Sequence, residues 1–172
     1  MISYLNKTKS MFMHKQFVSN PIISIYRLFI LFFLDFFRIT TKVSINHYKF
    51  KFNFLYIPSN KIKIGGRGFF LLREKIEDLF EFGHQFVNKN EHCIDGGANQ
   101  GIFSLSFASA VGPNGKVVAV EPFDYCIKYL KQNINLNNIH NIHLHHRVLF
   151  SKPGLDKKLD YSNGVGGASI VR

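Results

Sequence analysis

Acidic residues, cysteines and long apolar runs are all scarce in this chain. Its 172 residues include 11 Asp and Glu against 22 Lys and Arg, which gives a net charge of +11. The only two cysteines, Cys93 and Cys126, lack CxxC spacing, so neither a disulfide framework nor a cysteine zinc site is indicated. The longest uninterrupted apolar run, Leu28 to Leu34, is far shorter than the roughly 20 residues that a membrane-spanning helix usually needs.

The positive charge is concentrated near the N-terminus. Residues 1 to 51 hold eight Lys and Arg and a single acid, Asp35, so they carry +7 of the +11. A basic segment of this kind can bind nucleic acid or an anionic membrane. No zinc-finger, RNP-type or helix-turn-helix signature is present, and we therefore expect no nucleic-acid partner. No small-residue cleavage site follows the hydrophobic segment, which argues against a secretory signal peptide and favours a cytoplasmic protein, free or membrane-associated.

Residues 1 to 42 form a basic N-terminal segment that contains one hydrophobic helix. Asn20-Pro21 is a typical helix start, and the helix is predicted to run to Thr40. On a helical projection the polar residues share a stripe about 80° wide, and Ile, Leu and Phe occupy the rest. That stripe consists of Asn20, Ser24, Arg27, Asp35, Arg38 and Lys42.

Three interpretations of this helix remain open. It could lie in a membrane interface with its cationic residues toward the headgroups, which would make residues 20 to 42 a membrane-binding surface. It could span a membrane as an anchor, since two charges do not forbid spanning. It could also pack on the following domain or on a partner protein.

The next segment alternates aromatic and polar residues from Tyr48 to Tyr56. This period of two predicts a half-buried strand with an aromatic core face, and a stacking platform for bases is the less favoured alternative. Glu74 to Val87 then shows the spacing of an amphipathic helix.

From residue 91 onward, predicted strands and helices alternate. We expect strands at 91 to 95, 116 to 121 and 142 to 150, with helices at 101 to 111 and 124 to 135 between them. Helical crossovers of this length imply a parallel sheet with helices on both faces. The fold class is therefore α/β, a doubly wound parallel sheet, and residues 43 to 172 form one incomplete cofactor-binding domain.

A glycine-rich turn between the first predicted strand and its helix is the candidate site. Asp95 ends the strand, Gly97 and Gly101 allow a tight turn and close ligand approach, and Asn99 tolerates unusual backbone angles. Glu121 ends the next strand. Because ligands bind at the carboxyl ends of parallel strands, the two acids are expected to face one ligand.

The residue at position 98 helps to identify that ligand. A dinucleotide fingerprint beginning at Gly96 would require glycine where Ala98 stands. The carboxylate of Asp95 would repel a pyrophosphate but attract the sulfonium and ammonium groups of S-adenosylmethionine (SAM). A nicotinamide-dependent oxidoreductase is therefore the less favoured enzyme.

Several segments together resemble the FkbM-type SAM-dependent methyltransferases. They are residues 95 to 101, residues 112 to 117, Glu121-Pro122, and Leu130 with Asn133 and Asn137, and the resemblance covers about residues 64 to 170. It implies a class I, Rossmann-like methyltransferase fold with SAM as cofactor, and methylation of a hydroxyl on a sugar, glycan or small molecule. The cofactor would be bound by Asp95, Gly97, Ala98, Asn99 and Gly101 around its methionine end, by Glu121 at its ribose and by Phe123 beside its adenine.

The chain also departs from that family. It ends at Arg172 before a segment resembling I-K-I-D-x-E-G, and no acid follows the third strand at Ser151-Lys152. We therefore expect roughly the first half of a methyltransferase domain, with an open edge at strand 91 to 95 and an uncovered apolar face. Marginal stability, homo-oligomerisation or pairing at that edge would follow. The alternative function is a truncated non-catalytic remnant, or a membrane-associated interaction protein that keeps only the cofactor-binding half.

The histidines give no metal site or catalytic base. His140, His143, His145 and His146 are clustered, but no nearby Cys or acid completes a tetrahedral ligand set, so no metal is predicted. His84 and His92 could lie near the cofactor, yet nothing in the sequence marks either as a base, and we name no catalytic residue.

Overall fold

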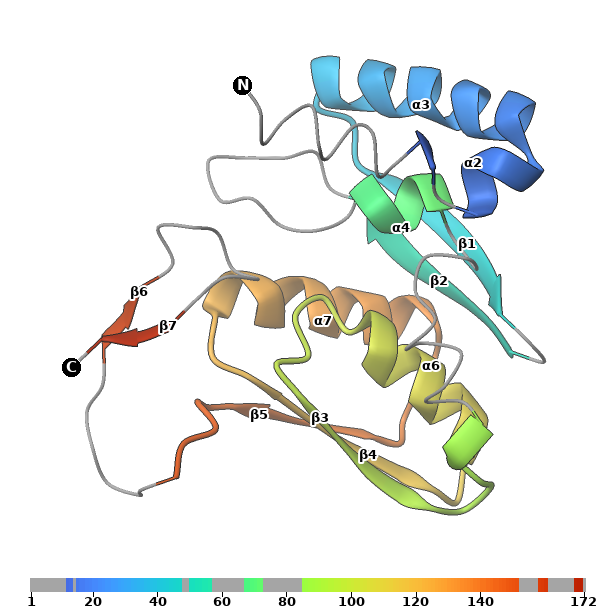
Figure 1. Ribbon diagram of the computed structural model, residues 1–172. Coiled ribbons are helices and arrows are strands. Elements are labelled where there is room, and N and C mark those ends of the chain that lie inside the picture. Colours follow the sequence, from blue (N-terminus) through green and yellow to red (C-terminus); the bar gives the residue numbers. More distant parts are fainter. Residues whose placement is uncertain are drawn as a thin grey trace.

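The computed structural model describes residues 12–13, 15–47, 50–56, 67–72, 85–151, 158–160 and 169–171 (Figure 1). The predicted helix at 74 to 87 lies almost entirely outside these residues. The N-terminal elements are α2 (Lys15–Ser19), α3 (Pro21–Phe36), β1 (Thr41–His47), β2 (Phe50–Tyr56) and α4 (Arg67–Leu72). The following elements are β3 (His92–Gly96), α6 (Ile102–Val111), β4 (Lys116–Glu121), α7 (Asp124–Leu136), β5 (Ile142–His146), β6 (Lys158–Asp160) and β7 (Ser169–Val171).

A parallel three-stranded sheet forms the base of the molecule, and the predicted α/β fold class is confirmed. Its strand order is β3-β4-β5, and β4 pairs in parallel with both neighbours. The strands β3 and β4 and the helices α6 and α7 begin and end within two residues of the sequence prediction. Strand β5 ends early, at His146 rather than at 150. Within the described part of the chain β3 is an edge strand, as the sequence predicted.

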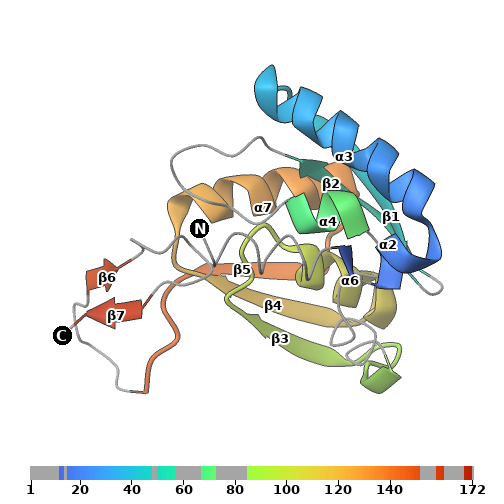
Figure 2. The ribbon, with the colours of Figure 1, turned by 45° about the horizontal axis from the view of Figure 1, so that its top comes forward.

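An N-terminal hairpin lies over the helices, not beside the sheet. The predicted strand at 48 to 56 corresponds to β2, which pairs antiparallel with β1, a strand that the sequence analysis missed. The hairpin packs on α6 and α7, and α3 with α4 lies above it (Figures 1 and 2). The side chains of Val43, Ile45 and Tyr56 are buried in a core that also includes Leu105 of α6. The N-terminal segment is thereby joined to the sheet through the helical layer.

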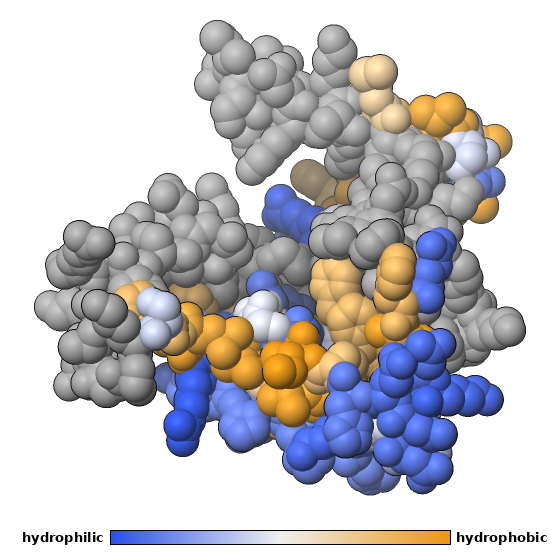
Figure 3. Space-filling model, turned by 60° about the horizontal axis from the view of Figure 1, so that its bottom comes forward, coloured by the Kyte–Doolittle hydropathy of each residue, from blue (hydrophilic) through white to orange (hydrophobic). Residues whose placement is uncertain are grey.

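Both crossover helices cover the same face of the sheet, so the expected cover on both faces is not found among the described elements. Val117 and Ala119 of β4 are buried against the helices, whereas Ile94 of β3, on the other face, is 71% exposed. Figure 3 shows hydrophobic side chains gathered in the middle of that open face, with hydrophilic ones along its rim. The reason is topological: each step from β3 to β4 to β5 moves in one direction, and crossovers of one hand then place their helices on one side.

The hydrophobic helix α3 begins where the sequence predicts and ends earlier. Pro21 is its first residue, but the Asn20 side chain donates to the Ser19 hydroxyl (3.2 Å) and makes no capping bond. The helix ends at Phe36, not at Thr40, because Arg38 adopts a left-handed backbone (φ 54°) and the Ile39 N–H bonds back to the Leu34 carbonyl (2.8 Å). That is the geometry of a left-handed C-terminal cap.

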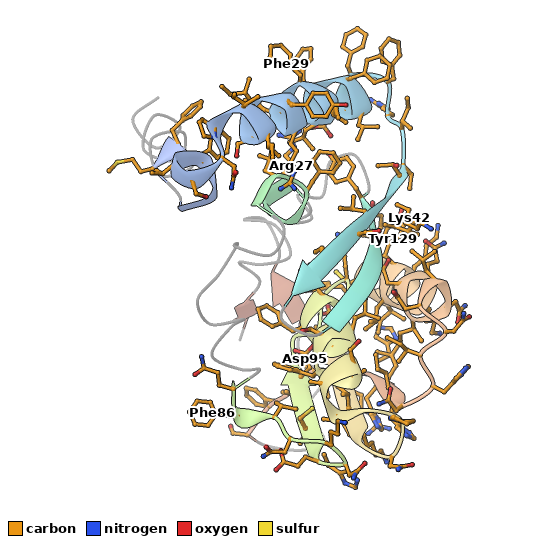
Figure 4. All side chains as sticks on the ribbon, turned by 90° about the vertical axis from the view of Figure 1, so that its right-hand side faces the viewer. Arg27, Phe29, Lys42, Phe86, Asp95 and Tyr129 are labelled. Atoms are coloured by element: carbon orange, nitrogen blue, oxygen red, sulfur yellow. The ribbon has the colours of Figure 1, made fainter. Side chains whose placement is uncertain are left out.

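The polar stripe of α3 faces the protein and its apolar face points outward. Arg27 Nη1 donates to the Leu71 carbonyl of α4 (3.1 Å), and Figure 4 shows Arg27 pointing toward α4 while Phe29 points away from the rest of the protein. Asp35 accepts a hydrogen bond from the Tyr56 hydroxyl and pairs with Arg67 (2.6 Å). Burial, and then the bond to Asp35, raises the pKa of Tyr56, which keeps it a donor. Among the described residues no helix is both long and apolar enough to cross a membrane.

Candidate cofactor site

The candidate site lies where β3 and β4 end side by side. Asp95 is paired in register with Ala119, and Glu121 closes β4 one residue beyond the last β3 pair. The chain after β3 folds back onto β4, because the N–H groups of Gly97 and Ala98 both donate to the Val120 carbonyl, at 2.8 and 3.0 Å. The turn is therefore fixed to the neighbouring strand before helix α6 begins.

Three residues of this turn have left-handed backbone angles. The φ values are 83° at Gly97, 52° at Asn99 and 85° at Gly101, and the Gly101 N–H closes the turn on the Ala98 carbonyl (2.8 Å). Glycine adopts such angles without strain, and asparagine tolerates them better than most residues. This geometry explains why Gly, Asn and Gly occur at alternate positions.

The two glycines have different neighbours. A Cβ built on Gly97 would meet no atom within 4 Å, so this position borders open space. A Cβ on Gly101 would lie 2.0 Å from Cδ1 of Leu130, a fully buried residue of α7. Gly97 thus leaves room for a ligand, and Gly101 leaves room for the packing of α6 against α7.

Glu121 holds the turn through backbone hydrogen bonds. Its carboxylate is only 2% exposed, and its two oxygens accept from the Asn99 N–H (2.8 Å) and the Phe123 N–H (3.0 Å). Each carboxylate oxygen can accept more than one bond, so lone pairs remain for ribose hydroxyls. The acid is therefore a structural part of the site besides being a candidate ligand of the cofactor.

Asp95 is the second acid of the site and is partly buried. The Ser104 hydroxyl, in the first turn of α6, donates to its Oδ2. Burial raises the pKa of Asp95, and the hydrogen bonds from Ser104 oppose that rise without cancelling it. A buried carboxylate with a raised pKa gains from a neighbouring cation, which would restore the charged form. Ser104 was not predicted as a site residue, because it is one of three serines in α6 and nothing in the sequence distinguishes it from Ser106 and Ser109.

Asn99 has its side chain held by α7. The Cys126 thiol donates to the Asn99 Oδ1 (3.5 Å), and burial, followed by the charge of Glu121, raises the pKa of Cys126 to about 12. The thiol therefore stays protonated and serves as a donor, not as a nucleophile.

The remaining predicted positions, Ala98 and Phe123, border the same turn. Ala98 is buried against Ala119 and Leu130, so its backbone and not its side chain faces the site. Phe123 is half-buried in extended conformation and precedes α7 directly. The structure thus brings all seven predicted positions together at two neighbouring strand ends.

Asn133 connects the turn to the N-terminal hairpin and was given no role in the sequence analysis. This fully buried amide of α7 donates to the Gln100 carbonyl (2.9 Å) and accepts from the Leu55 N–H of β2 (2.8 Å). The neighbouring Gln100 side chain is buried too, and its Oε1 has no hydrogen-bond partner. The hairpin is therefore coupled to the site through one side chain.

Replacing Asn133 with alanine should lower the free energy of unfolding by about 2 to 6 kcal/mol, because it leaves the Gln100 carbonyl and the Leu55 N–H without their partner, at about 1 to 3 kcal/mol each. Urea denaturation followed by circular dichroism measures this. Asn137→Ala is the matched control, since that amide is only partly buried and donates to the Asn133 carbonyl, at 2.7 Å. Equal losses in the two variants would refute the bridging role of Asn133.

Of the histidines, only His146 lies next to the candidate site among the described residues, because it is in register with Glu121. His143 and His145 are exposed on β5, and His146 Nε2 lies 2.8 Å from the Pro122 carbonyl oxygen. His92 begins β3, at the opposite end of the strand from the turn, and His84 is outside the described residues. No group of three or more His, Cys, Asp or Glu suited to a metal occurs in the described part of the chain.

Comparisons with known proteins give similar folds and no family. No family model matches the chain. No curated protein matches it either. Similar solved structures include TYW2 of P. horikoshii in complex with MeSAdo, with 22% identity over 66% of this chain and 39% of that one, at a TM-score of 0.43. A SAM-dependent O-methyltransferase of Thermotoga maritima shows 20% identity over 61% of this chain and 40% of that one, at 0.39.

Aeropyrum pernix fibrillarin, solved with natively bound SAM, is a third similar structure, with 18% identity over 36% of this chain and 26% of that one, at a TM-score of 0.33. The chain spans 40% or less of the length of each of these three proteins. All three are too distant from this chain for activity or substrate to be transferred.

Proposed function

We propose that this chain is the cofactor-binding part of a SAM-dependent methyltransferase. The observation that carries the proposal is the position of two acids, at the ends of neighbouring strands, on either side of a turn with left-handed backbone angles. Asp95 ends β3, Gly97 opens the turn toward free space, and buried Glu121 at the end of β4 holds the turn in place. Parallel sheets bind nucleotide-like ligands at this edge.

The polar groups of the turn fit SAM better than a dinucleotide. Bound SAM supplies a methyl group on a positively charged sulfur, for transfer to an acceptor. Partly buried Asp95 would attract the cationic methionine end, while Glu121 would accept from the ribose hydroxyls and Phe123 would flank the adenine. A pyrophosphate would instead meet the carboxylates of Asp95 and Glu121, and Ala98 breaks the glycine fingerprint. The role of these residues is to position the cofactor and to keep water from it.

The finer assignment concerns the methyl acceptor. In line with the resemblance to FkbM-type enzymes, we infer O-methylation of a sugar, glycan or small-molecule hydroxyl. The similar solved structures include one described as an rRNA methylase as well as an O-methyltransferase, so they do not discriminate between acceptors. No residue of the described chain is assigned as the base.

The second candidate is a protein that binds the cofactor without turnover. Ile94 is exposed on the open face of the sheet, and one edge of β3 has no partner strand among the described residues. Both features favour this candidate, because both would be covered in a larger assembly. Pairing of two copies at that edge would be one such assembly. The two candidates differ in one result: SAM binding is common to both, and methyl transfer belongs only to the first.

The variant Asp95→Asn tests the proposal through charge. We expect it to weaken SAM binding by tenfold or more in calorimetry, because an amide does not attract a cation. Burial disfavours the ionised form of Asp95 in the folded protein, so its contribution to stability falls as pH rises through the raised pKa. At neutral pH the variant should therefore be at least as stable as the wild type, which separates lost binding from lost folding.

The pH dependence provides a second readout for the same variant. Wild-type affinity for SAM should fall as the pH falls through the raised pKa of Asp95, above the usual range near 4 for aspartate, and the variant should show no such step. Glu91→Gln is the matched control, because it removes one charge at the opposite, exposed end of β3. Unchanged SAM affinity in a folded Asp95→Asn protein would reject the site.

A further inference from the structure

The hydrophobic helix α3 carries an exposed apolar surface that the proposed function does not use. We call it the outer face of α3, and it consists of Ile22, Tyr26, Phe29, Phe32, Phe33 and Phe36. Each of these side chains is more than half exposed, and Phe29 and Phe32 are both 72% exposed. A single exposed phenylalanine needs no explanation. Six large apolar side chains along one helix, however, form a continuous patch of the kind that marks an interaction site.

The orientation of α3 is fixed by its polar stripe. Arg27 bonds to the Leu71 carbonyl and Asp35 bonds to Tyr56 and Arg67, so the polar residues are already paired on the protein side. Turning the helix to bury its phenylalanines would break these bonds. The apolar outer face is therefore a stable feature of the fold. The sequence suggested a helix whose polar stripe points toward lipid headgroups, whereas in the structure that stripe points toward the protein.

The charge around this face selects the partner. Residues 1 to 73 contain 12 Lys and Arg and one acid, a net charge of +11, whereas residues 74 to 172 contain ten of each sign. The single acid, Asp35, is paired with Arg67 at 2.6 Å. Arg38 is exposed two residues beyond the end of the helix. The apolar face is thus attached to the part of the chain that carries the whole net positive charge.

From this combination we infer that the outer face of α3 inserts into the surface of a membrane containing anionic lipid, with Arg38 at the headgroups. Apolar side chains would enter the acyl region while cations next to the helix meet negative headgroups. A second copy fits less well, because α3 against α3 would bring two segments of +11 together. Two hollows of about 580 and 320 Å³ flank the helix, and both are lined in part by Leu28 and Phe32. Fluid acyl chains can fill such an uneven surface.

Vesicle flotation tests this inference with the complete chain. The probes are vesicles of phosphatidylcholine alone and of phosphatidylcholine mixed with phosphatidylglycerol. We expect the wild type to float with the anionic vesicles, to float less at high salt, and to bind the neutral vesicles several-fold more weakly. The double variant Phe29→Ser, Phe36→Ser should lose most of its binding, because these two rings are among the most exposed of the outer face.

Phe86→Ser is the matched control, since Phe86 is also more than half exposed, at 64%, but lies far along the chain from α3. It should float like the wild type, and circular dichroism should show both variants folded. Equal flotation of the double variant, or no flotation of the wild type, would overturn the inference. A wild-type dimer in light scattering that the double variant converts to monomer would also overturn it, in favour of a second copy. SAM binding should be unchanged in all variants, so this inference and the proposed function fail separately.

Discussion

Gly101→Ala is expected to lower the free energy of unfolding by about 2 to 5 kcal/mol, whereas Gly97→Ala should cost only about 1 to 2 kcal/mol. Both glycines have positive φ, so each substitution carries the left-handed penalty of about 1 to 2 kcal/mol. Only at Gly101 would the new methyl group also collide with Leu130, at 2.0 Å, which adds overpacking of about 1 to 3 kcal/mol. Urea denaturation of the three proteins measures the difference.

The collision itself can be isolated by a double-mutant cycle. Leu130→Ala alone should cost about 2 to 5 kcal/mol, because Leu130 is fully buried. In the double variant the methyl group of residue 101 would occupy part of the space left by Leu130, so the combined loss should be smaller than the sum of the single losses. Additive losses would show that the two positions do not interact and would leave only the backbone term.

The two glycine variants, Gly97→Ala and Gly101→Ala, also distinguish an effect on folding from an effect on SAM binding. Gly97→Ala should fold and yet bind SAM at least tenfold more weakly, since its methyl group would project into the open space of the turn. Gly101→Ala should lose binding only together with folding. If Gly97→Ala bound SAM as the wild type does, the cofactor would not approach the turn at this residue.

Glu121→Ala is the second substitution with a large expected effect. It would leave the N–H groups of Asn99 and Phe123 without their acceptor in a buried place, at about 1 to 3 kcal/mol each. We expect a total loss of roughly 2 to 6 kcal/mol in the free energy of unfolding. The cofactor would at the same time lose the proposed ribose acceptor, so binding should disappear even at temperatures where the variant is folded.

Glu121→Gln should have an intermediate effect. A glutamine can keep one of the two bonds with its oxygen, but its amide group would face the second N–H as another donor. The expected order of stability is wild type, then Glu121→Gln, then Glu121→Ala. Thermal denaturation with and without S-adenosylhomocysteine gives stability and binding in one experiment, and a Glu121→Gln protein as stable as the wild type would disprove the structural role of this acid.

The double role of Glu121 illustrates what the sequence could and could not predict at the site. The positions of Asp95 and Glu121 at strand ends follow from periodicity and from the glycine pattern between them. The backbone partners of Glu121 depend on the left-handed angles at Gly97, Asn99 and Gly101, which bring the Asn99 N–H to the carboxylate. Residue types alone do not specify such a path.

The part of the fold that the sequence did not predict is the part that depends on contacts between distant segments. Strand β1 carries the alternation that marks a strand, with Val43 and Ile45 buried, but the predicted helix ended at Thr40 and the first predicted strand began only at Tyr48. The helix ends at Phe36 through the backbone of Arg38, a non-glycine residue that gives no sequence signal.

The direction in which the polar stripe of α3 faces could not be predicted, for a related reason. A helical projection shows that the polar residues share one stripe, and polar stripes usually face water. Here Arg27 and Asp35 have partners 44 and 21 residues away, Leu71 and Tyr56. No local pattern encodes these partners, so the amphipathic spacing was read correctly but its direction could not be derived.

The most direct test of the central claim is a calorimetric titration of the folded wild-type chain with S-adenosylhomocysteine. This molecule has the ammonium, ribose and adenine groups that Asp95, Glu121 and Phe123 are proposed to meet. We predict saturable binding of one molecule per chain, weakened at least tenfold in Gly97→Ala and abolished in Glu121→Ala. A folded wild-type sample that shows no saturable heat with S-adenosylhomocysteine or with SAM would contradict the account.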